Sequence, residues 1–262
     1  MTMGTDRYAY SSRLKEVDPI PKLWFSLAVL LVCLFSESIS VGLVTALVMG
    51  ALTVGLGGQR PKTVLHFLKI PLAFLIIGCA TVVLRPVSEE TEALCAFRLL
   101  GRFRWGITVG YLRMGLMVFC KALGAISAMY FLSLNTPVTD LTMALERLHV
   151  PRLLVELMEL IYRFIFVLMD TAGRIRVAQE SRLGYQGFRQ SLECVGTMLS
   201  LVFLRAWRQG DRVYAALEAR GYTGSLVTLP MEYQNGKKLY FWGIGVVALQ
   251  LLVFFAESGV LK

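Results

Sequence analysis

The chain has 262 residues, of which 56% are hydrophobic, and a mean hydropathy of +0.61. This composition is too apolar for an ordinary water-soluble domain and is typical of a polytopic membrane protein. The formal net charge of +9 does not indicate nucleic acid as a partner, because Lys and Arg are scattered between apolar stretches and no basic-aromatic recognition module occurs.

Five apolar stretches predict helices that span a bilayer. Residues 23–35 and 39–55 are separated only by the sequence Ser-Glu-Ser at 36–38, which predicts a tight helical hairpin. Residues 63–84, 107–132 and 239–256 are each long enough to cross the ~30 Å hydrocarbon layer. We therefore predict an all-α polytopic membrane protein with about five transmembrane helices.

The distribution of basic residues predicts the topology. With a cytoplasmic N-terminus, 20 of the 27 Lys and Arg residues lie inside and five lie outside, while Arg113 and Lys121 fall within a span. This divides the chain into three parts: a membrane domain of about four spans (1–132), a cytoplasmic module (133–238) and a C-terminal transmembrane helix (239–262). The apolar stretches 152–170 and 192–204 are not assigned as spans, because the arginines between them would then form a positive cluster on the outer face.

Spacing predicts three helices in the cytoplasmic module. Leucines at steps of four and three after Thr136-Pro137 predict a short amphipathic helix that stops before Pro151. A second helix runs from Arg152 to about Arg182, with charged residues on one stripe, in which Glu159 and Arg163 can pair. A third begins near Phe188 and stops at Gly221. The second and third helices are each on the order of 45 Å long.

Two of these helices end in an arginine. The two segments are Ser181-Arg182-Leu183 and Ala219-Arg220-Gly221. A cation in the last turn complements the helix macrodipole, and a glycine just past the end is the usual C-cap, so either segment alone has a purely structural explanation. Their repetition in one module, with small neighbouring residues, favours docking on a partner protein, since a guanidinium suits bidentate contacts with carboxylates or carbonyls.

The segments Ala-Gln-Glu-Ser-Arg-Leu-Gly-Tyr at 178–185 and Ala-Leu-Glu-Ala-Arg-Gly-Tyr at 216–222 resemble the paired Ala-Arg-Gly motifs of a known family. This family is the transmembrane coupling (T) component of energy-coupling factor transporters, and the stretch 136–222 is similar to its cobalt-type branch, CbiQ. The first motif departs from the commoner pattern, because Ser181 and Leu183 stand where Ala and Gly are usual.

The resemblance implies a non-catalytic coupling subunit of an ATP-driven importer in a bacterial inner membrane, with cobalt as the expected cargo and nickel or a vitamin as alternatives. Its long coupling helices would contact two cytoplasmic ABC-type ATPase subunits. Arg182 and Arg220 would be the docking residues, Ser181, Ala219 and Gly221 would shape the contact, and Leu183 would complete the first docking motif. It also implies a separate substrate-binding membrane (S) subunit. No cofactor is expected on this chain, because ATP and Mg²⁺ would be bound by the partner ATPases.

The residues themselves agree with a chain that neither hydrolyses ATP nor binds the cargo. No GxxxxGK[ST] phosphate loop occurs. His66 and His149 lie far apart without a neighbouring cysteine cluster, so we expect no metal site, and no constellation of catalytic residues is found.

Two alternatives remain. In a self-contained secondary transporter, Lys121 and Arg113 would line a pathway; their simpler explanation is that Arg113 snorkels to the surface and Lys121 contacts a polar group on a neighbouring helix. A membrane enzyme acting on lipids would need a His, Asp or Ser cluster at a membrane face, and the sequence indicates none.

Overall fold

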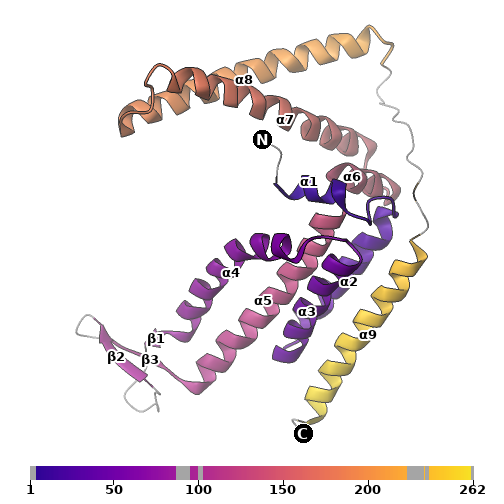
Figure 1. Ribbon diagram of the computed structural model, residues 1–262, viewed down its shortest axis with the longest axis vertical. Helices are drawn as coiled ribbons and strands as arrows, with labels where there is room; N and C mark the ends of the chain where they lie inside the picture. Colours follow the sequence, from indigo (N-terminus) through magenta and orange to yellow (C-terminus); the bar gives the residue numbers. More distant parts are fainter. Residues whose placement is uncertain (1–3, 87–94, 100–102, 223–232, 234–235, 261–262) are drawn as a thin grey trace. The chain divides into compact units, whose positions relative to one another are not determined.

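The computed structural model describes residues 4–86, 95–99, 103–222, 233 and 236–260 (Figure 1). The chain forms two compact units. Among the described residues, the membrane unit comprises those within Gly4–Pro137 and Tyr233–Lys262, and the motif unit comprises those within Val138–Glu232. Residues 223–232, which the sequence analysis assigned to the cytoplasmic module, lie outside the described residues.

The membrane unit is built from apolar helices. In chain order they are α1 (Gly4–Ser11), α2 (Pro19–Phe35), α3 (Ile39–Gly55), α4 (Pro61–Val83), α5 (Val109–Asn135) and α9 (Lys237–Val260). Within the described residues, α4, α5 and α9 are long and apolar enough to cross a membrane, while α2 and α3 are shorter apolar helices of 17 residues. The predicted polytopic helical class is therefore confirmed.

A small antiparallel sheet between α4 and α5 was not predicted. Its strands are β1 (Arg85–Pro86), β2 (Cys95–Leu99) and β3 (Phe103–Ile107), in the order β1-β3-β2. The sequence around β2 and β3 alternates apolar and basic residues, which is the period-two pattern of a strand. The predictions above contain no strand here, because the arginines of this stretch enter only into the count of basic residues on the outer side.

The predicted hairpin of α2 and α3 is correct in its connection and wrong in its packing. Ser38 caps α3 by accepting a hydrogen bond from the Val41 backbone N–H at 3.3 Å, so the turn occupies only residues 36–38. Helix α3 packs mainly against α5, whereas α2 packs equally against α5 and α9, and the two helices make few contacts with each other. A Cβ atom on Gly42 would lie 2.6 Å from the Cys120 carbonyl oxygen, so the absence of a side chain lets α3 approach the α5 backbone closely.

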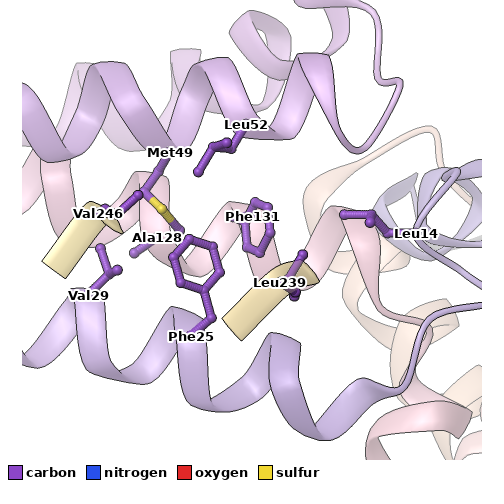
Figure 2. Packing of buried hydrophobic residues seen from close by; sticks show 9 residues of the cluster. All are labelled: Leu14, Phe25, Val29, Met49, Leu52, Ala128, Phe131, Leu239 and Val246. Atoms are coloured by element: carbon purple, nitrogen blue, oxygen red, sulfur yellow. The ribbon is translucent and has the colours of Figure 1, made fainter. Parts of the chain in front are cut away.

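The core of the membrane unit lies where α2, α3, α5 and α9 meet (Figure 2). Phe25 and Phe131 pack edge to face with ring centroids 5.1 Å apart, an arrangement that aromatic pairs favour. The buried cluster consists of Leu14, Phe25, Val29, Met49, Leu52, Ala128, Phe131, Leu239 and Val246. Helix α4 lies outside this core, since none of its residues is buried.

Lys22 was counted as one of the cytoplasmic basic residues before the first span, but the structure places it inside α2 and fully buried. Its ammonium donates hydrogen bonds to the carbonyl oxygens of Leu14 at 2.7 Å and of Asn135 at 3.4 Å. These bonds tie the segment before α2 to the last residue of α5. Charge counting could not detect this, because a buried and an exposed lysine look the same in sequence.

The motif unit contains the three predicted helices, α6 (Val138–Arg147), α7 (Arg152–Glu180) and α8 (Phe188–Glu218). Glycines at 196 and 210 are accommodated inside α8 without ending it. Figure 1 shows α7 and α8 as a helical hairpin whose arms diverge from the turn, and both helices expose many large apolar side chains.

The predicted pairing of Glu159 with Arg163 is wrong. Three ion pairs lie along α7, and none among the described residues joins Glu159 to Arg163. They join Arg152 to Glu156 at 3.1 Å, Arg174 to Asp170, and Arg176 to Glu180 at 2.8 Å. Burial, followed by the nearby charges of Glu146 and Glu156, raises the pKa of the Glu159 carboxyl.

Candidate functional site

The two arginine segments adopt the same backbone turn at the ends of α7 and α8. Ser181 has φ −62° and ψ −20°, and Ala219 has φ −61° and ψ −21°. The residue after each arginine is left-handed, with φ 59° at Leu183 and 75° at Gly221. Two segments of different sequence thus share one geometry.

Both turns are Schellman motifs, in which a backbone N–H bonds back to a carbonyl five residues earlier. The Gly184 N–H donates to the Gln179 carbonyl at 2.9 Å, and the Tyr222 N–H donates to the Leu217 carbonyl at 3.0 Å. These bonds satisfy carbonyls that a helix end leaves without partners. The arginine therefore occupies an equivalent position in both turns, directly before the left-handed residue.

Both arginine side chains are available to bind. Arg182 and Arg220 are exposed, and neither guanidinium forms a hydrogen bond or ion pair with any residue that the structure describes. The partial negative charge of each helix C-terminus favours a cation there. An exposed guanidinium with five unused donors suits the recognition of carboxylates or carbonyl oxygens.

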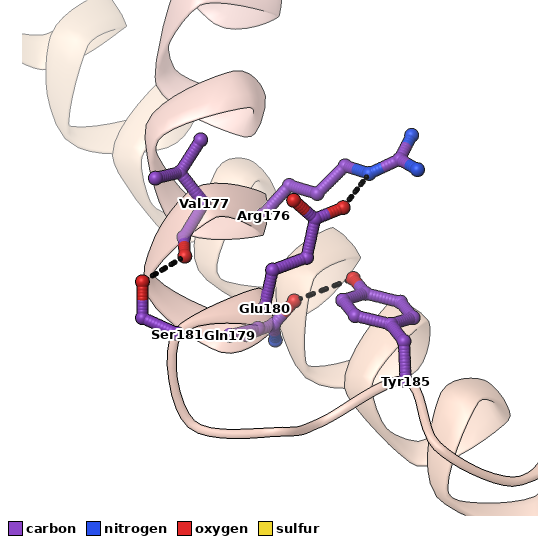
Figure 3. A network of polar contacts seen from close by, with 6 residues as sticks. All are labelled: Arg176, Val177, Gln179, Glu180, Ser181 and Tyr185. Carbon is purple, nitrogen blue, oxygen red and sulfur yellow. Dashed lines mark hydrogen bonds and ion pairs between the residues drawn. The ribbon is translucent and has the colours of Figure 1, made fainter.

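A polar network around the first motif explains why Arg182 stays free (Figure 3). Arg176 Nε lies 2.8 Å from Glu180 Oε1, so the carboxylate nearest to Arg182 in sequence is already paired. The hydrogen bond and charge of Glu180 raise the pKa of the Arg176 guanidinium. The Ser181 hydroxyl donates to the Val177 carbonyl at 2.9 Å, which keeps this side chain turned back along α7.

Contacts with α8 fix the first motif in place. The Tyr185 hydroxyl donates to Gln179 Oε1 at 2.7 Å, and Gln179 Nε2 donates to the Cys194 carbonyl at 2.9 Å. Gly184 is buried, and a Cβ atom there would lie 2.7 Å from Cys194 Sγ. The sequence analysis did not identify Gln179, Gly184 or Tyr185 as supporting residues, although Gly-Tyr follows the arginine in both motifs.

The second motif stands alone at the far end of α8. No heavy atom in the described chain lies within 4 Å of a Cβ atom built on Gly221. Because α8 has 31 residues, it separates the two motifs by about 46 Å. The site is thus two equivalent arginine turns at the two ends of one helix.

The structure does not unite Arg113 and Lys121 with an acidic partner. Both lie on α5, with Arg113 exposed near its start and Lys121 half-buried. The Lys121 backbone carbonyl accepts a weak hydrogen bond from the Cys33 thiol at 3.7 Å. Neither α4 nor α5 contains an acidic residue. Among the described residues, no three His, Cys, Asp or Glu side chains are grouped so that they could hold a metal ion.

The fold and the site together define an integral membrane protein with apolar spanning helices and a second helical unit that presents two arginine turns. Residues 11–229 match the family described as cobalt transport protein, CbiQ. This range covers most of the 262 residues, and the chain belongs to the CbiQ family.

Individual relatives agree with this assignment. The cobalt transport protein CbiQ of Salmonella typhimurium is 30% identical over 221 residues, which cover 84% of this chain and 97% of the relative. The energy-coupling factor transporter transmembrane protein EcfT of Acidaminococcus fermentans is 28% identical over 273 aligned positions, covering 99% and 98%. An uncharacterized protein of Methanocaldococcus jannaschii is 30% identical over 254, covering 97% and 93%. The chain is therefore a membrane component of a cobalt or energy-coupling factor type of transporter.

Proposed function

We propose that this protein is the non-catalytic coupling subunit of an ATP-driven importer, and that Arg182 and Arg220 each dock on one of two cytoplasmic ATPase subunits. The observation that carries the proposal is the equivalence of the two turns: the same Schellman geometry, the same position of the arginine, and for neither guanidinium a partner among the described residues. Two equivalent turns, joined by one helix, could each bind the same kind of surface on one of two similar subunits.

The helical hairpin gives a route for mechanical coupling. An α-helix of 31 residues with continuous backbone hydrogen bonds moves as a rod, so displacement at either motif is carried along α8. The bonds of Gln179 with Tyr185 and with the Cys194 carbonyl hold α7 to α8 at the turn. Movement of the ATPases would thus reach α7, and through it a separate substrate-binding membrane subunit.

The proposed cargo is cobalt ion, which rests on the family description and on the names of relatives such as CbiQ of Salmonella typhimurium. The cargo would be bound by the partner membrane subunit, and ATP with Mg²⁺ by the ATPases. We further propose a location in the bacterial inner membrane with the N-terminus and the motif unit in the cytoplasm, since this orientation keeps most basic residues inside.

The decisive experiment is purification of the tagged chain from native membranes in mild detergent, in wild-type form and as Arg182→Glu with Arg220→Glu. We expect two nucleotide-binding subunits to co-purify with the wild type and to be lost from the double variant, because each reversal places an anion against a groove that accepts a cation. The matched control is Arg189→Glu with Arg205→Glu, which makes the same charge change at exposed positions of α8 outside the motifs.

Retention of both ATPases by the motif variant would refute the docking role. A wild-type chain that purifies alone and transports without ATP would instead support a secondary transporter, for which Lys121→Met should abolish transport. In the coupling mechanism, Lys121→Met should have a mild effect.

A further inference from the structure

A cavity of about 450 Å³ lies between the last turns of α4 and the first turns of α5, at the end of both helices that adjoins the sheet. Its walls are Ile76, Cys79 and Ala80 on α4 and Leu112, Leu116 and Phe119 on α5. The volume falls in the ~300–1,000 Å³ range of small-molecule sites, and the lining is almost wholly apolar. Nothing in the proposed coupling function uses this cavity.

The cavity is open to the surroundings, and its rim is apolar. Its rim residues Ile76, Leu112 and Leu116 are 52%, 49% and 51% exposed. Gly115 brings the two helices together beside it, because a Cβ atom there would lie 2.4 Å from Val83 Cγ2. Since α4 and α5 both have the length and hydropathy of membrane spans, an opening with such an apolar rim suits lipid hydrocarbon better than water.

An exposed arginine neighbours the cavity lining in sequence. Arg113 follows the rim residue Leu112, about 6 Å from the start of α5, and is exposed. Its guanidinium has no hydrogen bond or ion pair with the residues that the structure describes, and neither α4 nor α5 supplies an acid. A long basic side chain so near a helix end reaches the headgroup layer while its stem stays in hydrocarbon.

We propose that this groove binds one phospholipid, with an acyl chain between α4 and α5 and the phosphate hydrogen-bonded to Arg113. The wall residues from Ile76 to Ala80 and onward to Val83 span about 10 Å along α4, a length that fits within one leaflet of a ~30 Å hydrocarbon core. Charge complementarity favours a phospholipid over a helix of another subunit, because Arg113, the residue next to Leu112, is an exposed cation without a partner among the described residues, and a phosphate accepts its donors bidentately.

The test is native mass spectrometry of the full chain in mild detergent, titrated with phosphatidylglycerol. We expect one tightly held lipid on the wild type, no such lipid on Ala80→Trp, which fills the groove, and about tenfold weaker binding to Arg113→Gln, which loses a charge-assisted contact. The control is Ala73→Trp, the same change two helical turns earlier on the same face of α4 and outside the cavity lining. It should retain the lipid.

Two further measurements separate the contribution of the phosphate to lipid binding from that of the acyl chain. Diacylglycerol, which lacks the phosphate, should bind the wild type as weakly as phosphatidylglycerol binds Arg113→Gln. If Ala80→Trp does not fold, Ala80→Leu, which fills less of the groove, should still weaken binding. Unchanged lipid retention in the filled variants would overturn the proposal, and so would a crosslink from Cys79 to another membrane protein in native membranes.

Discussion

At the scale of single residues, the first arginine motif places Leu183 in a backbone conformation that suits glycine. Its φ of 59° matches the 75° of Gly221 in the second motif. A left-handed residue with a Cβ atom costs roughly 1–2 kcal/mol. Leu183 is also exposed, so its side chain recovers little of this cost by burial. The turn is therefore imposed by the Schellman bonds and by packing on α8.

We predict that Leu183→Gly raises the free energy of unfolding of the motif unit by about 1 kcal/mol, because glycine adopts the left-handed region without steric cost. The measurement is the midpoint of thermal unfolding in detergent, which should rise. Gly221→Ala is the converse change and should lower it. A lower midpoint for Leu183→Gly would show that the Leu183 side chain makes a stabilising contact.

At the scale of helices, the turn between α7 and α8 is held in place by hydrogen bonds and close packing. Gln179 bonds to both Tyr185 and the Cys194 carbonyl, and Gly184 lets the turn lie directly against Cys194. The other end of α8 has no comparable support in the described residues, since Gly221 faces open space. The two motifs thus share a geometry and differ in rigidity.

We predict that Gly184→Ala destabilises this turn by about 1–3 kcal/mol, because the new methyl group would lie 2.7 Å from Cys194 Sγ and 3.0 Å from the Gln179 carbonyl oxygen. Hydrogen exchange of the turn amides should become faster. Gly187→Ala is the matched control, since no heavy atom lies within 4 Å of its Cβ position. Adding Cys194→Ala should restore part of the protection; a turn equally protected in Gly184→Ala would contradict the close-packing argument.

At the scale of the whole molecule, α5 organises the membrane unit. Helix α3 meets it through Gly42, and a Cβ atom on Gly124 would lie 2.8 Å from both Cys33 Sγ and the Gly42 carbonyl oxygen. A hydrogen bond also joins α9 to α3, since Gln250 on α9 donates to Thr45 Oγ1 on α3 at 2.7 Å. Helices in lipid associate largely through such close approach and interhelical hydrogen bonds.

We predict that Gly42→Ala lowers the stability of the membrane unit by about 1–3 kcal/mol, because its methyl group would meet the α5 backbone, which cannot move aside as a side chain can. Gly50→Ala on the same helix meets nothing within 4 Å and should be neutral. The stability of both variants is measured as the fraction of protein that stays monodisperse after heating in detergent. Equal losses for the two variants would show that α3 and α5 do not depend on this contact.

The sequence by itself determined the apolar helices and the three helices of the motif unit, together with the two arginine positions, but it did not indicate α1. Runs of apolar residues, the prolines at 19, 61 and 137 and the glycines at 184 and 221 mark most helix boundaries through local rules of propensity and capping. Local rules also located Arg182 and Arg220, because a helix end is defined by its own few residues.

The tertiary structure decided what depends on neighbours distant in the chain. It buried Lys22, packed α3 on α5 and α2 on both α5 and α9, formed the sheet between α4 and α5, and gave Leu183 a left-handed backbone that suits glycine. Each outcome follows from close approach or hydrogen bonding between segments far apart in sequence, and no local pattern of residue types carries that information.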